Sequence, residues 1–310
     1  MHNLLNILRK PARVPAGPWI DGPDALNRLE VARVSEAFKA AARDLIVDGF
    51  TVLRGAINPD LCAEVIADYH RYAAENAGGV NFDAQGRELR LLQFHWWSDA
   101  SMRIATDPGV MALLDFIFGR RASPYSSLTF KYGTQQEIHR DTPHFATWPR
   151  SQFVGVWTAL EDIDPSSGPL QYVKGAHRYR LAPEDVLAHV RTKHTHLTPE
   201  GQIDRALYRY NDQVMLHAAD HGELTPAPQM KRGDVAIWHA ELPHGGSPAT
   251  DPMRSRWSMV VHCMPEAVQG HEYKTFFTHE GEAPPPDRYA FREAHDRKVA
   301  YIGDPTYATQ

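Results

Sequence analysis

Three features are scarce or missing in this sequence: cysteine, long apolar runs and an excess of positive charge. The two cysteines, Cys62 and Cys263, are too few for a disulfide framework and form no C-x-x-C pair. No apolar run is long enough to span a membrane, and the short, partly apolar start of the chain is interrupted by Arg9 and Lys10. These absences predict a cytoplasmic protein with reduced thiols that does not enter a membrane.

The charge balance argues against a nucleic-acid partner. The net charge is −5 at pH 7, and the isoelectric point is about 6.4. Proteins that bind the phosphate backbone usually carry a basic patch or stripe, and this composition offers no such excess. We therefore expect a small-molecule partner and no nucleic acid.

Length and composition predict one catalytic domain over residues 1–310. A chain of this length with 43% hydrophobic residues can bury a large core, and β-barrels of this size are commonly one domain. Residues 1–34 are expected to form an N-terminal arm, which is also a candidate homodimer contact. The tail from about 281 to 310 is expected to be a second arm with one short helix near 289–298.

Helix signals precede the strand-like part of the chain. Helices are predicted over residues 35–48, 58–79 and 107–119 from apolar residues at helical spacing. Ser35 is a suitable N-cap for the first helix, and Pro59 suits the first turn of the second. These helices predict a layer packed on the outside of a β-barrel.

The strongest chemical signal is the pair His139 and Asp141. Residues two apart on an extended strand project to the same face, so this imidazole and this carboxylate would converge. His244, in a later strand-like stretch, is the natural third ligand. Two histidines and one carboxylate would leave the remaining coordination positions of an Fe(II) ion open for chemistry.

Spacing alone leaves this metal site undecided. Among 17 histidines an H-x-D pair can arise by chance, and His144 lies close enough to compete for the ligand role. Zinc also accepts a similar set of ligands, so the residue types do not choose iron.

Six motifs follow in order over roughly residues 40–265, and together they resemble the phytanoyl-CoA dioxygenase family of iron(II)- and 2-oxoglutarate-dependent oxygenases. They are a strand bearing Lys131, the His139–Asp141 pair, Trp157-Thr158-Ala159-Leu160-Glu161-Asp162, the hairpin from Gly168 to His177, Gly233-Asp234 and His244-Gly245. The chain departs from the family at Gly175-Ala176-His177, where Pro-Gly-Ser-His is usual. Residues from about 185 to 230 match nothing in the family and are a candidate lid.

The resemblance implies a mostly β fold, a double-stranded β-helix (jelly roll, cupin-like) with flanking N-terminal α-helices. It implies Fe(II) and 2-oxoglutarate as cofactors, and hydroxylation of an unactivated C–H in a small polar or anionic metabolite or natural-product intermediate. Dioxygen would be consumed, and succinate and carbon dioxide released. Two alternatives remain: the same chemistry ending in desaturation, epimerisation or cyclisation, and a cupin-like metal-dependent hydrolase or isomerase that does not use 2-oxoglutarate.

A bound 2-oxoglutarate would need a cation at its distal carboxylate, because a buried carboxylate without a partner is costly. Arginine suits this role, since its planar fork pairs both oxygens. The strand from Trp257 to His262 is similar to the family's, and this resemblance puts Arg256 at the position that binds the distal carboxylate. Ser258, two residues later, is expected on the same strand face. Lys131 and Trp157 are further cofactor candidates, although a solvated lysine and a core tryptophan are ordinary alternatives.

The sequence identifies the substrate only by candidate contacts. Polar and aromatic residues beside the H-x-D pair and in the unmatched stretch would suit a polar or anionic substrate. The candidates are Trp97, Arg140, His144 and Arg209, with Trp96, Phe145, Arg205, Tyr208 and Tyr210 as further neighbours. The alternative for residues 185–230 is a solvated loop held by its own tyrosines.

Overall fold

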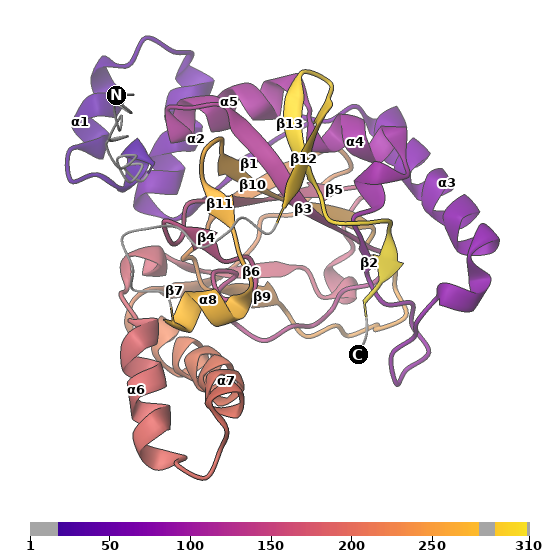
Figure 1. Ribbon diagram of the computed structural model, residues 1–310. Helices are drawn as coiled ribbons and strands as arrows, with labels where there is room; N and C mark the ends of the chain where they lie inside the picture. Colours follow the sequence, from indigo (N-terminus) through magenta and orange to yellow (C-terminus); the bar gives the residue numbers. More distant parts are fainter. Residues whose placement is uncertain (1–17, 279–288, 309–310) are drawn as a thin grey trace, which may run out of the picture.

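The computed structural model describes residues 18–278 and 289–308, and a seven-stranded antiparallel sheet is its largest element (Figure 1). The strands, in spatial order, are β1 (Phe50–Leu53), β8 (Val235–His239), β5 (Val154–Ala159), β10 (Ser258–Pro265), β3 (Ala122–Phe130), β2 (Leu91–Leu92) and β14 (Thr306–Tyr307). Two strands at one edge, β2 and β14, are only two residues long, so this edge offers little backbone for pairing with another chain.

A smaller sheet packs against one face of the large one. Its order is β7 (Glu223–Pro226), β6 (Leu170–Lys174) and β9 (His244–Gly246). Phe50 of β1 stacks on Tyr172 of β6 with ring centroids 4.3 Å apart, so the sheets meet face to face. Two facing antiparallel sheets form the predicted jelly roll. A two-stranded ribbon of β4 (Thr147–Trp148) and β11 (Gln269–Gly270) lies beside them.

The central strands are buried along their whole length. Every residue of β5, β8 and β10 is buried. On β5, Val154 and Val156 join the cluster under the helices, whereas Trp157 and Ala159 join the cluster between the sheets. Burial on both faces explains why hydrophobic and polar residues do not alternate in the sequence of these strands.

Helices cover the outer face of the large sheet (Figure 1). The three predicted helices are present as α2 (Glu36–Val47), α3 (Pro59–Glu75) and α5 (Pro108–Phe118), and Ser35 caps α2 by accepting from the Phe38 N–H. Two shorter helices, α1 (Ala25–Val31) and α4 (Asp99–Ala105), were not predicted. Single 3-10 turns are found at Trp19–Asp21, Ala77–Gly79, Phe94–Trp96, Pro165–Ser167, Ala176–Arg178 and Ala218–Asp220.

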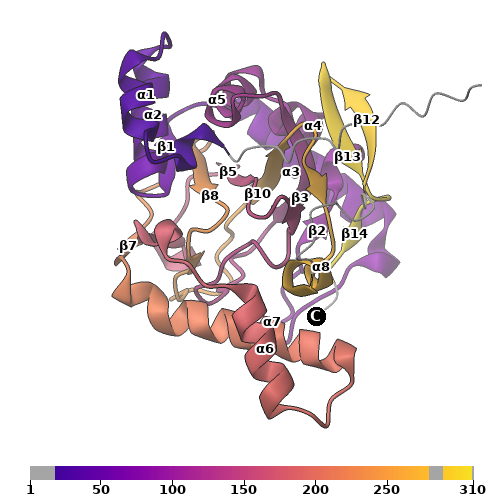
Figure 2. The ribbon, with the colours of Figure 1, turned by 60° about the vertical axis from the view of Figure 1, so that its left-hand side comes forward.

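The stretch predicted as an insert is largely helical rather than a solvated loop. Helices α6 (Pro183–Lys193) and α7 (Pro199–His217) pack on each other and on α8 (Tyr273–Thr278), and Val190 and Tyr210 are fully buried between them. Figures 1 and 2 show α6 and α7 at the end of the molecule opposite α5.

The helix predicted near 289–298 is wrong. Residues Ala290–Ala294 (β12) and Arg297–Tyr301 (β13) form an antiparallel hairpin. Its two turn residues, His295 and Asp296, both have positive φ angles, as the tight hairpin turn requires. The predicted arms lie partly outside the described residues, at 1–17, 279–288 and 309–310. No helix within the described ranges is long and apolar enough to span a membrane.

Candidate active site

The site begins with a backbone pairing between two distant segments. The N–H of His139 donates to the His244 carbonyl, and the N–H of His244 donates to the His139 carbonyl, both at 2.9 Å. Residues that exchange both bonds across an antiparallel pair project their side chains to the same face. The two imidazoles therefore lie side by side, with centroids 4.6 Å apart.

Each imidazole is oriented by a carbonyl of its own segment. Nδ1 of His139 lies 2.7 Å from the Glu137 carbonyl, and Nδ1 of His244 lies 2.9 Å from the Leu242 carbonyl. A carbonyl only accepts, so Nδ1 carries a proton, and in the neutral ring the lone pair is therefore on Nε2. Both Nε2 atoms are thereby prepared as metal ligands.

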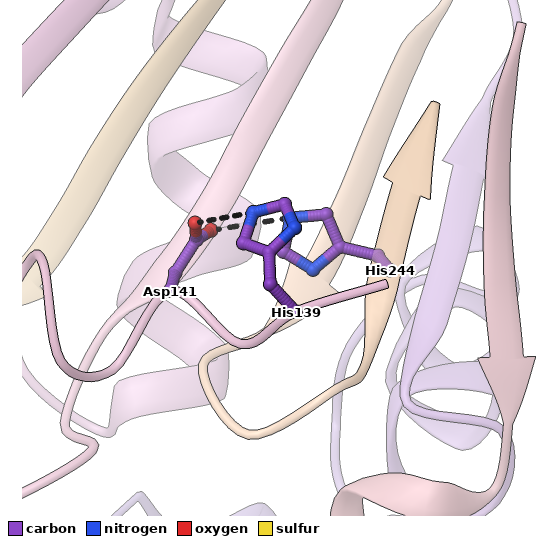
Figure 3. A group of neighbouring side chains, drawn as sticks. All are labelled: His139, Asp141 and His244. Atoms are coloured by element: carbon purple, nitrogen blue, oxygen red, sulfur yellow. Dashed lines mark ion pairs between the residues drawn. The ribbon is translucent and has the colours of Figure 1, made fainter. Parts of the chain in front are cut away.

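Asp141 brings the carboxylate to the same point (Figure 3). Its Oδ1 lies 3.7 Å from Nε2 of His139, and its Oδ2 lies 3.5 Å from Nε2 of His244. One ligand atom from each residue falls within 4.8 Å of the others. Asp141 starts a turn rather than continuing a strand, because its carbonyl accepts from the N–H groups of His144 and Phe145.

Two residues that sequence reasoning missed hold Asp141 in place. The Trp238 indole N–H donates to Oδ2 at 2.9 Å, and Nε2 of His262 lies 3.3 Å from the same oxygen. His262 stacks on Phe145 at 3.6 Å between centroids. A β-carbon on Gly155 would lie 2.3 Å from the Trp238 ring, so the glycine makes room for the indole. The His262 stretch was visible as a strand, but nothing in its sequence indicated this contact.

The protonation states suit a divalent metal. Burial lowers the pKa of His244 to about 4, so its ring is neutral at neutral pH. Burial would raise the pKa of Asp141, but His244, His139 and His262 around the carboxylate hold this pKa well below its ordinary range. A neutral His244 imidazole beside the ionised Asp141 carboxylate fits the ligand set of Fe(II).

His139, Asp141 and His244 line one cavity, and Arg256 lines it too. No carboxylate of the described residues pairs with Arg256. Its side chain is buried, one terminal N–H donates to the Gly168 carbonyl, and its Nε has no hydrogen-bond partner among the described residues. Burial lowers the pKa of Arg256 to about 10, so it remains charged at neutral pH. A buried cation of this kind is ready to bind an anion.

The other cofactor candidates divide into two groups. Trp157 lines the cavity, whereas Ser258 and Lys131 do not. The Ser258 hydroxyl is buried and donates to the Arg256 carbonyl. Lys131 is held by an ion pair with Glu88 at 2.9 Å.

Of the four substrate candidates, only His144 lines the cavity, and Phe145 lies next to it. Trp97 packs on Tyr72 of α3 and on Phe94. Arg209 belongs to α7 and does not line the cavity either. The positions of Trp97 and Arg209 therefore do not support contact with a substrate in this cavity.

Arg140 is also turned away from the cavity. It pairs with Glu241 at 3.0 Å and donates to the Ala176 and Tyr179 carbonyls. The alternation that groups His139 with Asp141 directs the residue between them to the opposite side. The cavity instead contains Arg90, which sequence reasoning did not select.

Known proteins resemble this chain over much of its length. The model of the family described as phytanoyl-CoA dioxygenase matches residues 46–256. Ectoine dioxygenase of Sphingopyxis alaskensis is 25% identical over 246 residues, which cover 73% of this chain and 75% of that protein.

Two solved structures share the fold. EctD from S. alaskensis, with 2-oxoglutarate and 5-hydroxyectoine, aligns at a TM-score of 0.61 and 17% identity, over 95% of this chain and 94% of its own. The epimerase SnoN, in complex with Fe3+, alpha-ketoglutarate and nogalamycin RO, aligns at 0.60 and 17% identity, over 85% of this chain and 98% of its own. The fold, the three converging ligands and the family match together show that this chain belongs to the phytanoyl-CoA dioxygenase family of iron(II)- and 2-oxoglutarate-dependent oxygenases.

Proposed function

We propose that this protein hydroxylates an unactivated C–H of a small polar or anionic metabolite or natural-product intermediate. The reaction consumes 2-oxoglutarate and dioxygen and releases succinate and carbon dioxide. One observation supports this proposal above the others: the cavity that contains His139, Asp141 and His244 also contains a buried arginine, Arg256, without a carboxylate partner.

His139, Asp141 and His244 would hold the iron on one side and leave its other coordination positions open. The bound metal supplies the oxidation of 2-oxoglutarate and the activation of dioxygen. The protein's own contribution is to position the reactants and to exclude water.

Arg256 would pair with the distal carboxylate of 2-oxoglutarate. Its free Nε and the adjacent N–H form the fork that a carboxylate can bridge. Trp157, Leu170 and Val260 provide apolar walls near it, and such walls strengthen the ion pair by keeping water away. Ser258 would help to position this segment through its bond to the Arg256 carbonyl.

The cupin-like hydrolase or isomerase is the rival from another class. It would use the three metal ligands but would not need a buried cation in the same cavity, so Arg256 favours the oxygenase. Desaturation, epimerisation and cyclisation remain alternative outcomes of the same chemistry, since they depend on how the substrate is placed.

We further propose that the protein acts in the cytoplasm and has no nucleic-acid partner. Its two cysteines are free and buried, as is usual in a reducing compartment. The homodimer remains a prediction from the sequence.

The test is anaerobic absorption spectroscopy of the apo-protein with Fe(II) and then 2-oxoglutarate. The chelate should give a weak visible charge-transfer band in the wild type. His139→Ala should abolish the band, while His196→Ala, which removes an exposed histidine far along the chain from the three ligands, should retain it. Tight Fe(II) binding without a band would contradict the use of 2-oxoglutarate and favour the cupin-like rival.

A further inference from the structure

Arg90 is a second arginine in the cavity, and it precedes a different strand from Arg256, which lies just before β10. It directly precedes β2, where Leu92 pairs with Leu128 of β3. Because side chains alternate along a strand, Arg90 and Leu92 share the face on which Leu128 and Phe130 line the cavity. Arg90 lines the cavity together with the three metal ligands.

The guanidinium of Arg90 has no partner among residues 18–278 and 289–308. No hydrogen bond or ion pair links it to another side chain or to the backbone there, and its Nε is buried. The neighbouring acids are engaged elsewhere: Glu88 pairs with Lys131, and Asp141 belongs to the metal ligands. A partly buried guanidinium left in this state calls for an anion from outside the chain.

The charges in the cavity indicate what kind of anion is missing. Apart from its histidines, the charged residues that line it are Arg90, Asp141 and Arg256. With the histidines counted as neutral, a bound Fe(II) and a 2-oxoglutarate dianion leave one positive charge uncompensated. A monoanion would balance it, and this favours a carboxylate over a phosphate dianion.

The electrostatics of Arg90 agree with this placement. Burial lowers the pKa of Arg90, and the charge of Asp141 partly opposes that change. Arg90 is therefore near enough to the metal ligands to act on them, while Arg256 carries no comparable influence of Asp141. The two arginines serve different parts of the cavity.

We propose that Arg90 binds a carboxylate of the substrate and that the body of the substrate packs against Leu128, Phe130 and Phe145. This inference rests on the proposed oxygenase function and names the substrate class for the same site. The planar fork of Arg90 would fix one end of the substrate, so that a C–H further along it faces the iron. Arg90 is thus a specificity-determining residue.

The test uses protein loaded anaerobically with Fe(II) and saturating 2-oxoglutarate, titrated calorimetrically with acids and their matched amides. The probes are butanoate, hexanoate and 3-phenylpropanoate, each beside its amide. The wild type should bind at least one acid about tenfold more tightly than its amide, as loss of one charge-assisted pair predicts. Arg90→Gln should reduce this preference to within about twofold while leaving the 2-oxoglutarate affinity unchanged.

Two further variants make the test specific. Arg254→Gln removes an exposed arginine whose partner is Asp164 and should behave as the wild type. Arg90→Lys keeps the charge but not the fork, so it should lose part of the acid preference even if Arg90→Gln does not fold.

Three results would overturn the inference: wild type that binds no acid more tightly than its amide, a preference that survives in both Arg90 variants, or an equal loss of 2-oxoglutarate affinity in Arg90→Gln. The last result would assign Arg90 to the 2-oxoglutarate site. A wild type that gives no chelate band at all would instead contradict the oxygenase function, whatever the acids and amides show.

Discussion

The backbones of His139 and His244 exchange two hydrogen bonds of 2.9 Å, although His139 lies outside the strands β1 to β14. This bridge ties the H-x-D segment to β9, together with the Gly246 N–H that donates to the Gln136 carbonyl at 2.9 Å, and it places both imidazoles on one face. Two metal ligands are thus positioned by backbone pairing and one by a turn. We expect the three ligands to be prearranged before metal binds, because carbonyls and the Trp238 indole already orient them.

Replacing Arg256 should separate 2-oxoglutarate binding from metal binding. Arg256→Gln removes the only buried charge proposed for the distal carboxylate, so the Kd for 2-oxoglutarate should rise about a hundredfold, the equivalent of roughly 3 kcal/mol. Fe(II) affinity should stay within about threefold, since Arg256 is not a ligand. Anaerobic titration of the chelate band measures both, with Arg254→Gln as the control. An unchanged Kd for 2-oxoglutarate would remove Arg256 from the site.

Trp238→Phe should weaken the metal site without unfolding the protein. The variant keeps the aromatic ring but loses the N–H that donates to Oδ2 of Asp141. Loss of such a supporting contact typically costs about 10- to 100-fold in metal affinity. Competition with a chelator of known affinity measures the change, and thermal unfolding of the metal-free protein verifies the fold.

Gly155→Ala should disturb the same contact from the other side. The added methyl would lie 2.3 Å from the Trp238 ring and 2.5 Å from its Nε1, so the indole must move, together with the N–H that donates to Asp141. We expect a loss of about 1–3 kcal/mol in stability from overpacking, together with weaker metal binding. Full metal affinity in Gly155→Ala would show that the position of the indole does not matter to Asp141.

Local signals explain what the sequence predicted correctly. The start of a helix is signalled by residues that are adjacent in the sequence. All three predicted helices begin at such signals: Ser35, the pair Asn58-Pro59 and the pair Asp107-Pro108. The convergence of His139 and Asp141 was predicted from their short spacing, and His244 was placed with them because the order of the motifs resembles the family.

What the sequence did not predict depends on contacts between distant segments. Trp238 and His262 reach Asp141 across 97 and 121 residues, so only the register of β8 and β10 reveals them. Arg90 precedes a strand of two residues, too short for a periodic pattern. The β12–β13 hairpin turns at His295 and Asp296, neither of which is the glycine that usually marks such a turn.

His95 should make the stability of the protein depend on pH. It is 2% exposed, its Nδ1 lies 2.5 Å from the Ser127 hydroxyl, and burial lowers its pKa to about 3. Below the ordinary histidine pKa of about 6.5 the unfolded chain binds a proton that the folded chain does not. The contribution of His95 to the free energy of unfolding is therefore fully present above about pH 6.5. It falls as the pH decreases, by up to about 1.4 kcal/mol per pH unit.

Urea unfolding of the metal-free protein between pH 5.5 and 7.5 measures this dependence. In His95→Gln the side chain cannot titrate. The slope of the free energy of unfolding against pH should therefore decrease by up to about 1.4 kcal/mol per pH unit, which corresponds to one proton. The comparison concerns slopes, so it holds even if the variant is less stable at every pH. Equal slopes in wild type and variant would mean that His95 is protonated equally in both states.

Glu241→Gln should destabilise the protein without affecting its cavity. Arg140 is 1% exposed, and Glu241 is the carboxylate that pairs with it at 3.0 Å. Removing that charge leaves a buried guanidinium whose acceptors are neutral: the Ala176 and Tyr179 carbonyls and the Tyr210 hydroxyl. Because the Glu241 side chain is partly exposed, we expect a loss of about 1–3 kcal/mol rather than the full cost of a buried pair. The 2-oxoglutarate affinity and the acid preference should remain within about twofold, since neither residue lines the cavity. A selective loss of acid binding at unchanged stability would instead make Arg140 a substrate contact, as its place between His139 and Asp141 first suggested.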